Sequence, residues 1–481
     1  MRLSNQSAPA LPYDRKAVTP GIVHLGIGAF HRAHMAVYVD SLLSRDPSWG
    51  IVGASLRRPD TREALEPQDF LYTVAIRDAG GTTPRIIGSI IDILDANTQR
   101  DTLIATLADS RIRIVSLTVT EKGYCHDPAT GKLDPKHPDI VHDLAHPEKP
   151  VSAPGLIVRA IQLRRAAGVA PFTVMSCDNL PANGKTVQRI VTGFAALQSQ
   201  DLADYIAAHV AFPSTMVDRI VPATTDADRA MVKELTGLDD AWPIMTEPFT
   251  QWVIEDRFAS GRPEFERVGG QLVEDVEPFE LMKLRMLNGS HSTMSYLGFL
   301  GGYQYVSEAI ADPAIRQLVH GLMTEEAMPT LPMDKTGLAA YRDELLARFV
   351  NPALKHRTWQ IAMDGSQKLP QRLLGTIRDR IAAGQPYTRL ALGVAAWMRY
   401  VTGIDETGNP IDVKDPHSAR LRAIADDAGR DPVALASGLL AVPEIFGSDL
   451  PQNVAFRETV IAHLRLLFEA GALETVRRVI A

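Results

Sequence analysis

The sequence predicts an α/β protein with a doubly wound parallel sheet in its first domain and a mostly α-helical second domain. Short β-rich runs alternate with helical patterns in the first half of the chain, which is typical of a parallel sheet with crossover helices. From about residue 277 onward, amphipathic helical patterns dominate. With 481 residues the chain exceeds the usual size of one hydrophobic core, so we expect two domains, 1–275 and 276–481.

The predicted strands of the first domain are short, apolar and rich in β-branched residues. After an initial run that ends before Gly26, they span Ile51–Leu56, Phe70–Ile76, Ile112–Val119 and Phe172–Ser176. Helical patterns lie between them at Met35–Leu43, Leu156–Arg165 and Lys185–Phe194. In the second domain, turns at Gly375 and at 403–410 separate the predicted helices.

A glycine turn connects the first predicted strand to the first helical pattern. Gly26 and Gly28 form a Gly-x-Gly sequence at this point. A strand, a glycine turn and a helix in this order can bind a dinucleotide pyrophosphate on backbone N–H groups. His31 occupies the place of the usual third glycine, so the pattern alone also fits a tight turn without a ligand.

An amine, an amide and an imidazole follow one another at the start of the second domain, at Lys283, Asn288 and His291. On an ideal α-helix, Asn288 lies about 140° and His291 about 80° around from Lys283, so the three side chains can share one face. Such a face can exchange a proton with an alcohol or a carbonyl and stabilise a developing oxyanion. A solvated polar helix face is the alternative.

These residues, taken together with further motifs, resemble the mannitol dehydrogenase family of polyol-specific long-chain dehydrogenases, which includes fructuronate reductases. The resemblance covers nearly the whole chain and implies a Rossmann-like first domain that binds the cofactor through Gly26, Gly28, Phe30 and Arg32. The matching segments are Gly26–His34, Ser116–Cys125, Phe172–Asn179, Phe212–Arg219, Glu247–Asp256 and Lys283–His291.

The resemblance also implies roles for the polar residues. Lys283 is the expected general acid and base, with Asn179 and Asn288 holding the reacting oxygen and His291 orienting its partners. Asp218 and Glu280 match family positions and can tune or relay protons for the lysine. Either carboxylate can equally be a structural salt-bridge partner.

Cofactor preference depends on the segment after the strand Ile51–Leu56. Asp60 can accept hydrogen bonds from ribose hydroxyls, whereas Arg57 and Arg58 would attract the 2′-phosphate of NADP. Family members that prefer NAD resemble this segment with an acidic residue at the place of Asp60, so we expect NAD. A solvated turn is the alternative.

The substrate expectation depends on added cations. The segment Asn351–Arg372, together with Lys122 and Arg285, resembles fructuronate reductases more than mannitol 2-dehydrogenases. A buried cation can pair with the carboxylate of a sugar acid, so D-fructuronate and D-mannonate are the expected pair. Mannitol 2-dehydrogenase, D-arabinitol 4-dehydrogenase and a catalytically silent nucleotide-sensing protein are the alternatives. The candidate substrate-binding cations are Lys122, Arg357, Lys368 and Arg372.

Composition excludes several other classes of partner. The formal net charge of −7 and the lack of a Lys/Arg run argue against nucleic acid or an anionic membrane, and the longest apolar runs are too short to cross a bilayer. Two cysteines, Cys125 and Cys177, give neither a disulfide framework nor zinc-ribbon spacing, and His31 with His34 lacks a third ligand. We therefore expect a cytoplasmic enzyme that uses no metal ion.

Overall fold

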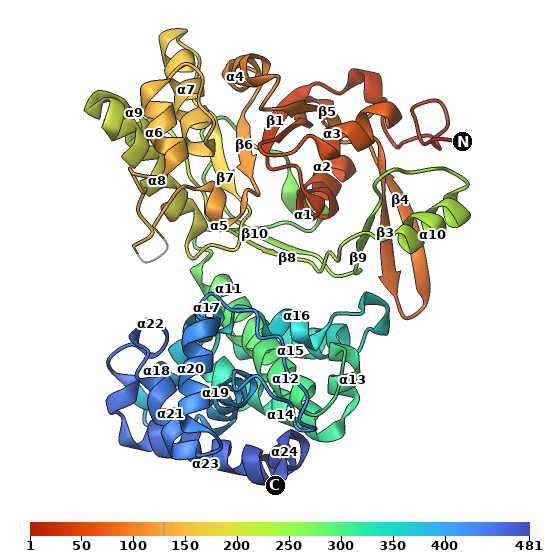
Figure 1. Ribbon diagram of the computed structural model, residues 1–481. Coiled ribbons are helices and arrows are strands. Elements are labelled where there is room, and N and C mark those ends of the chain that lie inside the picture. The colour runs from red at the N-terminus through yellow and green to blue at the C-terminus, as the bar shows by residue number, and fades with distance from the viewer. Residues whose placement is uncertain (128–129) are drawn as a thin grey trace. The chain divides into compact units, whose positions relative to one another are not determined.

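A computed structural model describes residues 1–127 and 130–481 and confirms the predicted fold class (Figure 1). The chain divides into two compact units, Met1–Glu277 and Pro278–Ala481. The first unit contains parallel sheet strands with intervening helices, whereas the described residues of the second unit form helices and no strand. None of the described helices combines the length and the apolar character that a bilayer span requires.

The central sheet of the first unit has five parallel strands in the order β5-β2-β1-β6-β7. Strand order reverses at β1, so the carboxyl ends of β1 and β6 lie side by side, with Leu25 paired to Leu117. In open sheets of this kind, ligands bind at this edge. The strands are β1 (Pro20–Leu25), β2 (Gly50–Ser55), β5 (Ile90–Asp95), β6 (Ile114–Leu117) and β7 (Thr173–Ser176).

Alternate side chains of the central sheet enter two different cores, as the two-residue period of a strand requires. Val23 and Leu25 pack in one core with helices α4 (Arg100–Ala108), α7 (Ala153–Ala166) and α8 (Asn183–Gln198). Ile22 packs in the other core with α2 (Met35–Leu42) and with Trp252 of a second sheet. That sheet contains β8 (Thr215–Asp218), β10 (Gln251–Glu255) and β11 (Gln271–Val273).

The expectation that Phe70–Ile76 belongs to the parallel sheet is wrong. This segment lies in β3 (Tyr72–Asp78), which forms an antiparallel hairpin with β4 (Gly81–Ile87) and pairs in parallel with β9 (Ile244–Thr246). The hairpin is the long two-stranded ribbon in Figure 1. Asp78 pairs with Gly81, so a two-residue turn reverses the chain before a crossover helix can form.

The other helices of the first unit are short and lie between the strands. They are α1 (Ala29–Ala33), α3 (Asp60–Leu65), α5 (Thr120–Gly123), α6 (Pro138–Ala145), α9 (Gln200–His209) and α10 (Asp226–Thr236).

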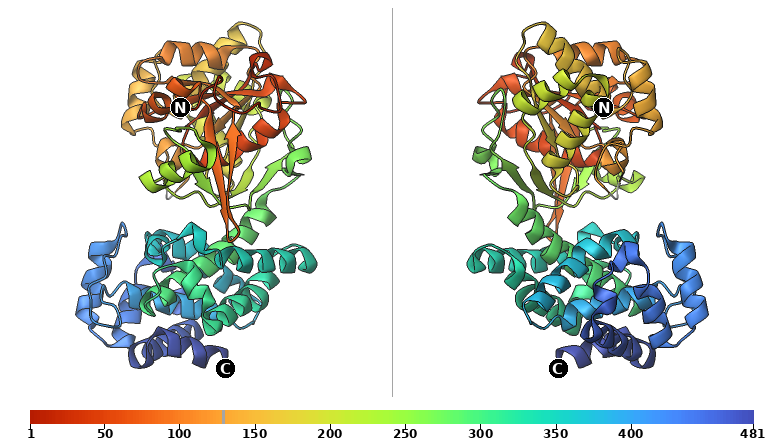
Figure 2. Two further views of the ribbon diagram at one scale, coloured as in Figure 1. Left: turned by 90° about the vertical axis from the view of Figure 1, so that its right-hand side faces the viewer. Right: turned by 90° about the vertical axis from the view of Figure 1, so that its left-hand side faces the viewer.

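The second unit is built around α12 (Gly289–Leu300) and α19 (Thr388–Tyr400), which are buried along most of their length. Figure 2 shows the helices of this unit in green to blue. A Cβ at Gly393 would lie 2.4 Å from Oγ1 of Thr293, so the two helices approach closely at this glycine. The remaining α-helices are α11 (Glu277–Met282), α13 (Val306–Ala311), α14 (Pro313–Gly321), α15 (Lys335–Phe349), α16 (Thr358–Ala362), α17 (Gly365–Leu369), α18 (Gly375–Ala382), α20 (Ser418–Ala428), α21 (Pro432–Leu440), α22 (Pro443–Phe446), α23 (Val454–Ala470) and α24 (Ala472–Ile480).

Candidate active site

The predicted glycine turn lies at the carboxyl edge of the central sheet, between β1 and α1. Gly26 has a φ of 91°, and a Cβ there would lie 2.2 Å from the carbonyl oxygen of Thr118, just after β6. Gly28 is exposed, and the nearest atom to a Cβ placed there is 3.8 Å away. The turn therefore needs glycine at the first position for packing and leaves open space at the second, which fits the close approach of a phosphate group.

His31, at the place of the third glycine, fills the space between α1 and β1. Its ring stacks on His24 with the centroids 3.4 Å apart and an interplanar angle of 17°. The His24 ring nitrogens lie 2.8 Å from the hydroxyl oxygens of Ser116 and Thr118. Burial lowers the pKa of His24 to about 3 and that of His31 well below its usual value, so both rings are neutral. A pair of stacked rings thus replaces the close contact that a third glycine would allow.

Phe30 and Arg32 flank the same turn but differ in environment. Phe30 is partly exposed and stacks on His34, with the centroids 5.0 Å apart. Arg32 is fully buried beside the rings of Trp242 and Tyr72, and it donates a hydrogen bond of 2.9 Å to the Trp242 carbonyl. This position favours a structural role for the Arg32 side chain over the predicted contact with a cofactor.

Asn179 lies at the same sheet edge, three residues after β7, and is exposed. The preceding carboxylate, Asp178, accepts hydrogen bonds from the N–H groups of Val119 and Thr120 at 2.9 and 3.1 Å and from the Tyr124 hydroxyl at 2.7 Å. These bonds tie the loop after β6 to the loop after β7. Our sequence reasoning did not single out Asp178 or Tyr124, although both stand inside the motifs that carry the resemblance.

Asp60 is the first residue of α3 and is exposed, as are Arg57 and Arg58. Arg57 forms an ion pair of 3.3 Å with Asp139 of α6. Both carboxylate and guanidinium groups are therefore present after β2, and the ion pair gives Arg57 a partner other than a phosphate.

Lys283 and Asn288 lie at the two ends of a six-residue π-helical segment, Lys283–Asn288, between α11 and α12. The N–H of Gly289 donates to the carbonyl oxygen of Leu284, five residues earlier. The angles that we predicted from an ideal α-helix are therefore wrong here. Because a π-turn joins residues five apart, Lys283 and Asn288 lie one turn from each other. Single π-turns inside α-helices occur frequently at functional sites.

His291 is buried in the first turn of α12, with its ring 4.7 Å from that of Phe349 and 5.5 Å from that of His356. Among the described residues, its Nε2 atom has no hydrogen-bond partner. Burial and the nearby His356, Arg372 and Arg348 lower the pKa of His291, so the ring is neutral. An unpartnered buried ring nitrogen can bind a substrate hydroxyl.

One of the predicted substrate-binding cations, Arg372, lies close to His291, and Lys368 lies close to Arg372 and His356. Arg372 donates a hydrogen bond of 3.2 Å to the hydroxyl of Ser292, and its π-helical segment, Pro370–Leu374, contacts the Lys283–Asn288 segment. Lys368 donates to the carbonyl oxygen of Met363 at 2.6 Å. Burial lowers the pKa of Lys368 to about 8, and the charge of Arg372 makes a smaller contribution in the same direction.

The other predicted cations have different environments. Lys122, in α5, and Arg357, at the start of α16, are exposed. Arg285 forms an ion pair of 2.6 Å with Asp379 and donates to the Thr330 carbonyl. Exposed or paired cations contribute little to the recognition of a carboxylate, so the structure supports Lys368 and Arg372 better than these three.

Asp218 and Glu280 are the two carboxylates that we expected to tune Lys283. Asp218 is 5% exposed and ends β8, and Glu280 is partly buried in α11. The neighbouring Arg219 donates hydrogen bonds to the carbonyl oxygens of Glu247 and Ala33 and thereby joins three segments of the first unit.

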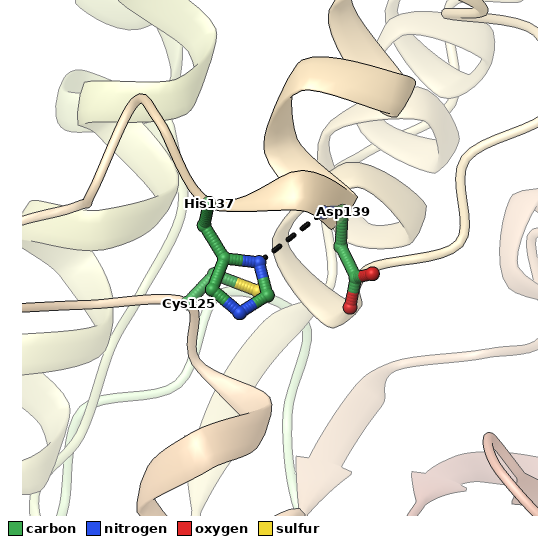
Figure 3. Close-up of side chains that lie close together, drawn as sticks. All are labelled: Cys125, His137 and Asp139. Atoms are coloured by element: carbon green, nitrogen blue, oxygen red, sulfur yellow. Dashed lines mark hydrogen bonds between the residues drawn. The ribbon is translucent and has the colours of Figure 1, made fainter.

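Cys125 lies in a group of side chains that could hold a metal ion, although the sequence showed no zinc-ribbon spacing. Its sulfur, an imidazole nitrogen of His137 and a carboxylate oxygen of Asp139 all lie within 4.8 Å of one another (Figure 3). The sequence spacing resembles no zinc motif, because the loop after α5 and the start of α6 come together only in the fold.

Comparison with known proteins identifies the family. A model of the mannitol dehydrogenase Rossmann domain matches residues 20–267, and one of the mannitol dehydrogenase C-terminal domain matches residues 275–467. The chain is 48% identical to the D-mannonate oxidoreductase of Escherichia coli over 98% of each protein. It is 43% identical to a mannitol 2-dehydrogenase of Pyrenophora tritici-repentis over 99% of this chain and 84% of that one.

A solved structure agrees with these matches. Mannitol 2-dehydrogenase of Pseudomonas fluorescens, in a ternary complex with NAD and D-mannitol, superimposes with a TM-score of 0.87 at 41% identity and 99% coverage of both chains. The glycine turn, the doubly wound sheet and the helical second unit therefore have one explanation: the chain belongs to the mannitol dehydrogenase family of oxidoreductases that act on CH–OH groups.

Proposed function

We propose that this protein is an NAD-dependent fructuronate reductase that interconverts D-fructuronate and D-mannonate, with Lys283 as the general acid and base and no metal ion in the chemistry. The observation that carries the substrate assignment is a pair of neighbouring, partly buried cations, Lys368 and Arg372, of which Arg372 lies near His291.

These two cations favour a negatively charged substrate. Within the described residues, neither Lys368 nor Arg372 has a carboxylate within salt-bridge distance. Burial lowers the pKa of both groups, which favours a partner that compensates their charge, although Asp364 and Asp415 act in the opposite direction on Lys368. Fructuronate differs from fructose by a terminal carboxylate, which would supply that compensation, whereas a neutral ketose would leave two partly buried charges unpaired.

The proton chemistry is assigned to Lys283 of the second unit and to polar residues from both units. In oxidation, neutral Lys283 accepts the proton of the reacting hydroxyl, and in reduction its ammonium group returns that proton to the oxygen. Asn288 and Asn179 donate hydrogen bonds to this oxygen, and the neutral ring of His291 binds a neighbouring hydroxyl. Asp218 and Glu280 are the carboxylates that we assign to tuning the lysine. NAD, when bound, supplies the hydride acceptor.

Cofactor binding is assigned to the first unit. Gly26 and Gly28 form the turn for the pyrophosphate, Phe30 lies beside it, and Asp60 accepts hydrogen bonds from the ribose. The solved relative that contains NAD supports this cofactor. Both cysteines are free thiols, which is consistent with the cytoplasmic location that we propose.

A substrate panel tests the proposal. We expect NADH oxidation with D-fructuronate to have a specificity constant about a hundredfold higher than with D-fructose, which corresponds to one charge-assisted contact of a few kcal/mol. D-arabinitol and D-mannitol, assayed with NAD in the oxidative direction, should be poor substrates compared with D-mannonate. Equal or better use of fructose would instead support mannitol 2-dehydrogenase, the activity named for two of the relatives above. A protein that binds NAD and turns over none of these compounds would contradict both assignments.

A further inference from the structure

The first unit contains a cluster of three potential metal ligands that the proposed reaction does not use. Cys125 follows α5, His137 is the residue before α6, and Asp139 lies in the first turn of α6. One ligand atom from each lies within 4.8 Å of the other two. Figure 3 shows the sulfur overlapping the imidazole ring in this view and the Asp139 carboxylate beside it, on the first turn of α6.

The backbone at Cys125 is held in an unusual conformation. Its φ of 52° lies in the left-handed region, which a residue with a Cβ seldom adopts. The N–H of Asp134 donates to the Cys125 carbonyl at 2.9 Å and ties this turn to the segment that leads into α6. Such outliers persist only where the surroundings enforce them, and they occur often at ligand sites.

The chemical types of the three side chains indicate which metal ion they would bind. We propose that Cys125, His137 and Asp139 form a Zn²⁺ site with a water molecule in the fourth position. Thiolate, imidazole and carboxylate are the three side-chain ligands that Zn²⁺ uses, and three protein ligands leave one open position in a tetrahedral site. The thiolate disfavours Mg²⁺ and Ca²⁺, which take oxygen ligands.

The charges around the thiol favour a cation at this place. The carboxylates of Asp139, Asp143 and Asp134 lie near the Cys125 sulfur, and Arg57 is the opposing charge. When the Zn–S bond forms, the S–H bond breaks and its proton passes to solvent, and the divalent charge offsets the surrounding carboxylates.

The interactions that the ion would displace are weak. His137 Nδ1 accepts a hydrogen bond of 3.2 Å from the N–H of Asp139, and water can replace this bond because both residues are partly exposed. The Asp139 ion pair with Arg57 uses one carboxylate oxygen, and the Arg57 side chain is 71% exposed. An exposed pair of this kind contributes little, so Asp139 can turn toward the metal.

This inference stands apart from the proposed function, since no step of proton or hydride transfer involves the ion. Its test uses the full chain without a histidine tag, treated with a chelator and desalted. Equilibrium dialysis against Zn²⁺ followed by metal analysis should give one ion per chain. Cys125→Ser should weaken binding at least about tenfold. Cys177→Ser is the matched control, because Cys177 is also a buried thiol but lies outside the cluster, and it should bind as the wild type does.

Co²⁺ provides a second measurement that needs no variant. In the wild type and in Cys177→Ser, Co²⁺ should give thiolate charge-transfer absorption and the intense visible bands of a four-coordinate site. If Cys125→Ser fails to fold, as judged by circular dichroism, His137→Gln and Asp139→Asn replace it, and each should weaken Zn²⁺ binding. Substoichiometric Zn²⁺ in the wild type, absence of the charge-transfer band, or equal binding by the ligand variants would overturn the proposal.

Discussion

The glycine turn of the first unit and the Lys283 segment of the second both place chemical groups at a change in backbone geometry, but they do so differently. The turn offers backbone N–H groups and open space, and its geometry depends on a single left-handed residue, Gly26. The π-helical segment Lys283–Asn288 offers side chains, and its neighbours include the buried His291 and the partly buried Arg372.

This difference determines how each region should respond to substitution. A side chain at Gly26 alters backbone packing, so it should affect stability and cofactor affinity together. A change to a functional side chain of the second unit leaves the backbone in place, so it should affect chemistry or substrate choice alone. Substitutions in each region separate these two responses.

Lys283→Ala should give the largest loss. Removal of the acid and base should lower turnover about a hundred- to ten-thousandfold, while NADH affinity, measured by fluorescence titration, stays within about twofold of the wild type. Lys283→Arg, which keeps the charge but not a group that titrates near neutral pH, should be similarly inactive. Near-normal turnover by either variant would refute the assigned role.

Gly26→Ala should affect stability and cofactor binding at once. The added Cβ meets the Thr118 carbonyl at 2.2 Å in a residue with positive φ, so the free energy of unfolding should fall by about 2 kcal/mol or more. Gly28→Ala is the control, since its Cβ has open space and a negative φ. It should unfold like the wild type in urea but bind NADH more weakly, because the methyl group occupies the space assigned to the phosphate. Equal stability of the two variants would contradict the account of this turn.

The pH dependence of substrate choice should report on Lys368. Its pKa is lowered to about 8, so the side chain is charged below that pH and becomes neutral above it. The ratio of the specificity constants for fructuronate and fructose should therefore fall as the pH rises through about 8. The titration of Lys283 should change both specificity constants by the same factor, so it cancels in their ratio. A Lys368→Met variant should show a lower ratio without this pH-dependent fall, and a flat ratio in the wild type would exclude Lys368 from carboxylate binding.

Asp60→Ala should have the smallest effect. Loss of an exposed carboxylate at the ribose should narrow the preference for NAD over NADP by roughly tenfold, or about 1.4 kcal/mol, without changing stability. Asp101 in the first turn of α4 is an exposed carboxylate in a similar helical position, so Asp101→Ala is the matched control. A wild type that already prefers NADPH would show that Arg57 and Arg58 determine the cofactor.

The extent to which the sequence predicted the structure differs between local and distant features. The order of strand, glycine turn and helix follows from neighbouring residues, and the structure contains it. The π-helical segment has no such signal, because Lys-Leu-Arg-Met-Leu consists of good formers of an ordinary α-helix, and the segment contacts another π-helical stretch at Pro370–Leu374.

A single sequence also could not predict which arginines are buried or which strands pair with each other. Arg357 and Arg372 belong to one resembling segment, yet the first is exposed and the second lies against α12. Residues Phe70–Ile76 have the pattern of a strand, but the pattern does not say which strand they pair with. Cys125 and His137 are far enough apart in sequence that only the fold brings them together.

The central claim is that the charge of Arg372 selects a substrate with a carboxylate. The most direct test of this claim is the ratio of the specificity constants for D-fructuronate and D-fructose. The ratio is measured in the wild type, in Arg372→Gln and in the exposed control Arg357→Gln. We predict a strong preference for fructuronate in the wild type and in Arg357→Gln, and loss of most of that preference in Arg372→Gln. An unchanged ratio in Arg372→Gln, or a wild type that uses fructose as well as fructuronate, would contradict the claim.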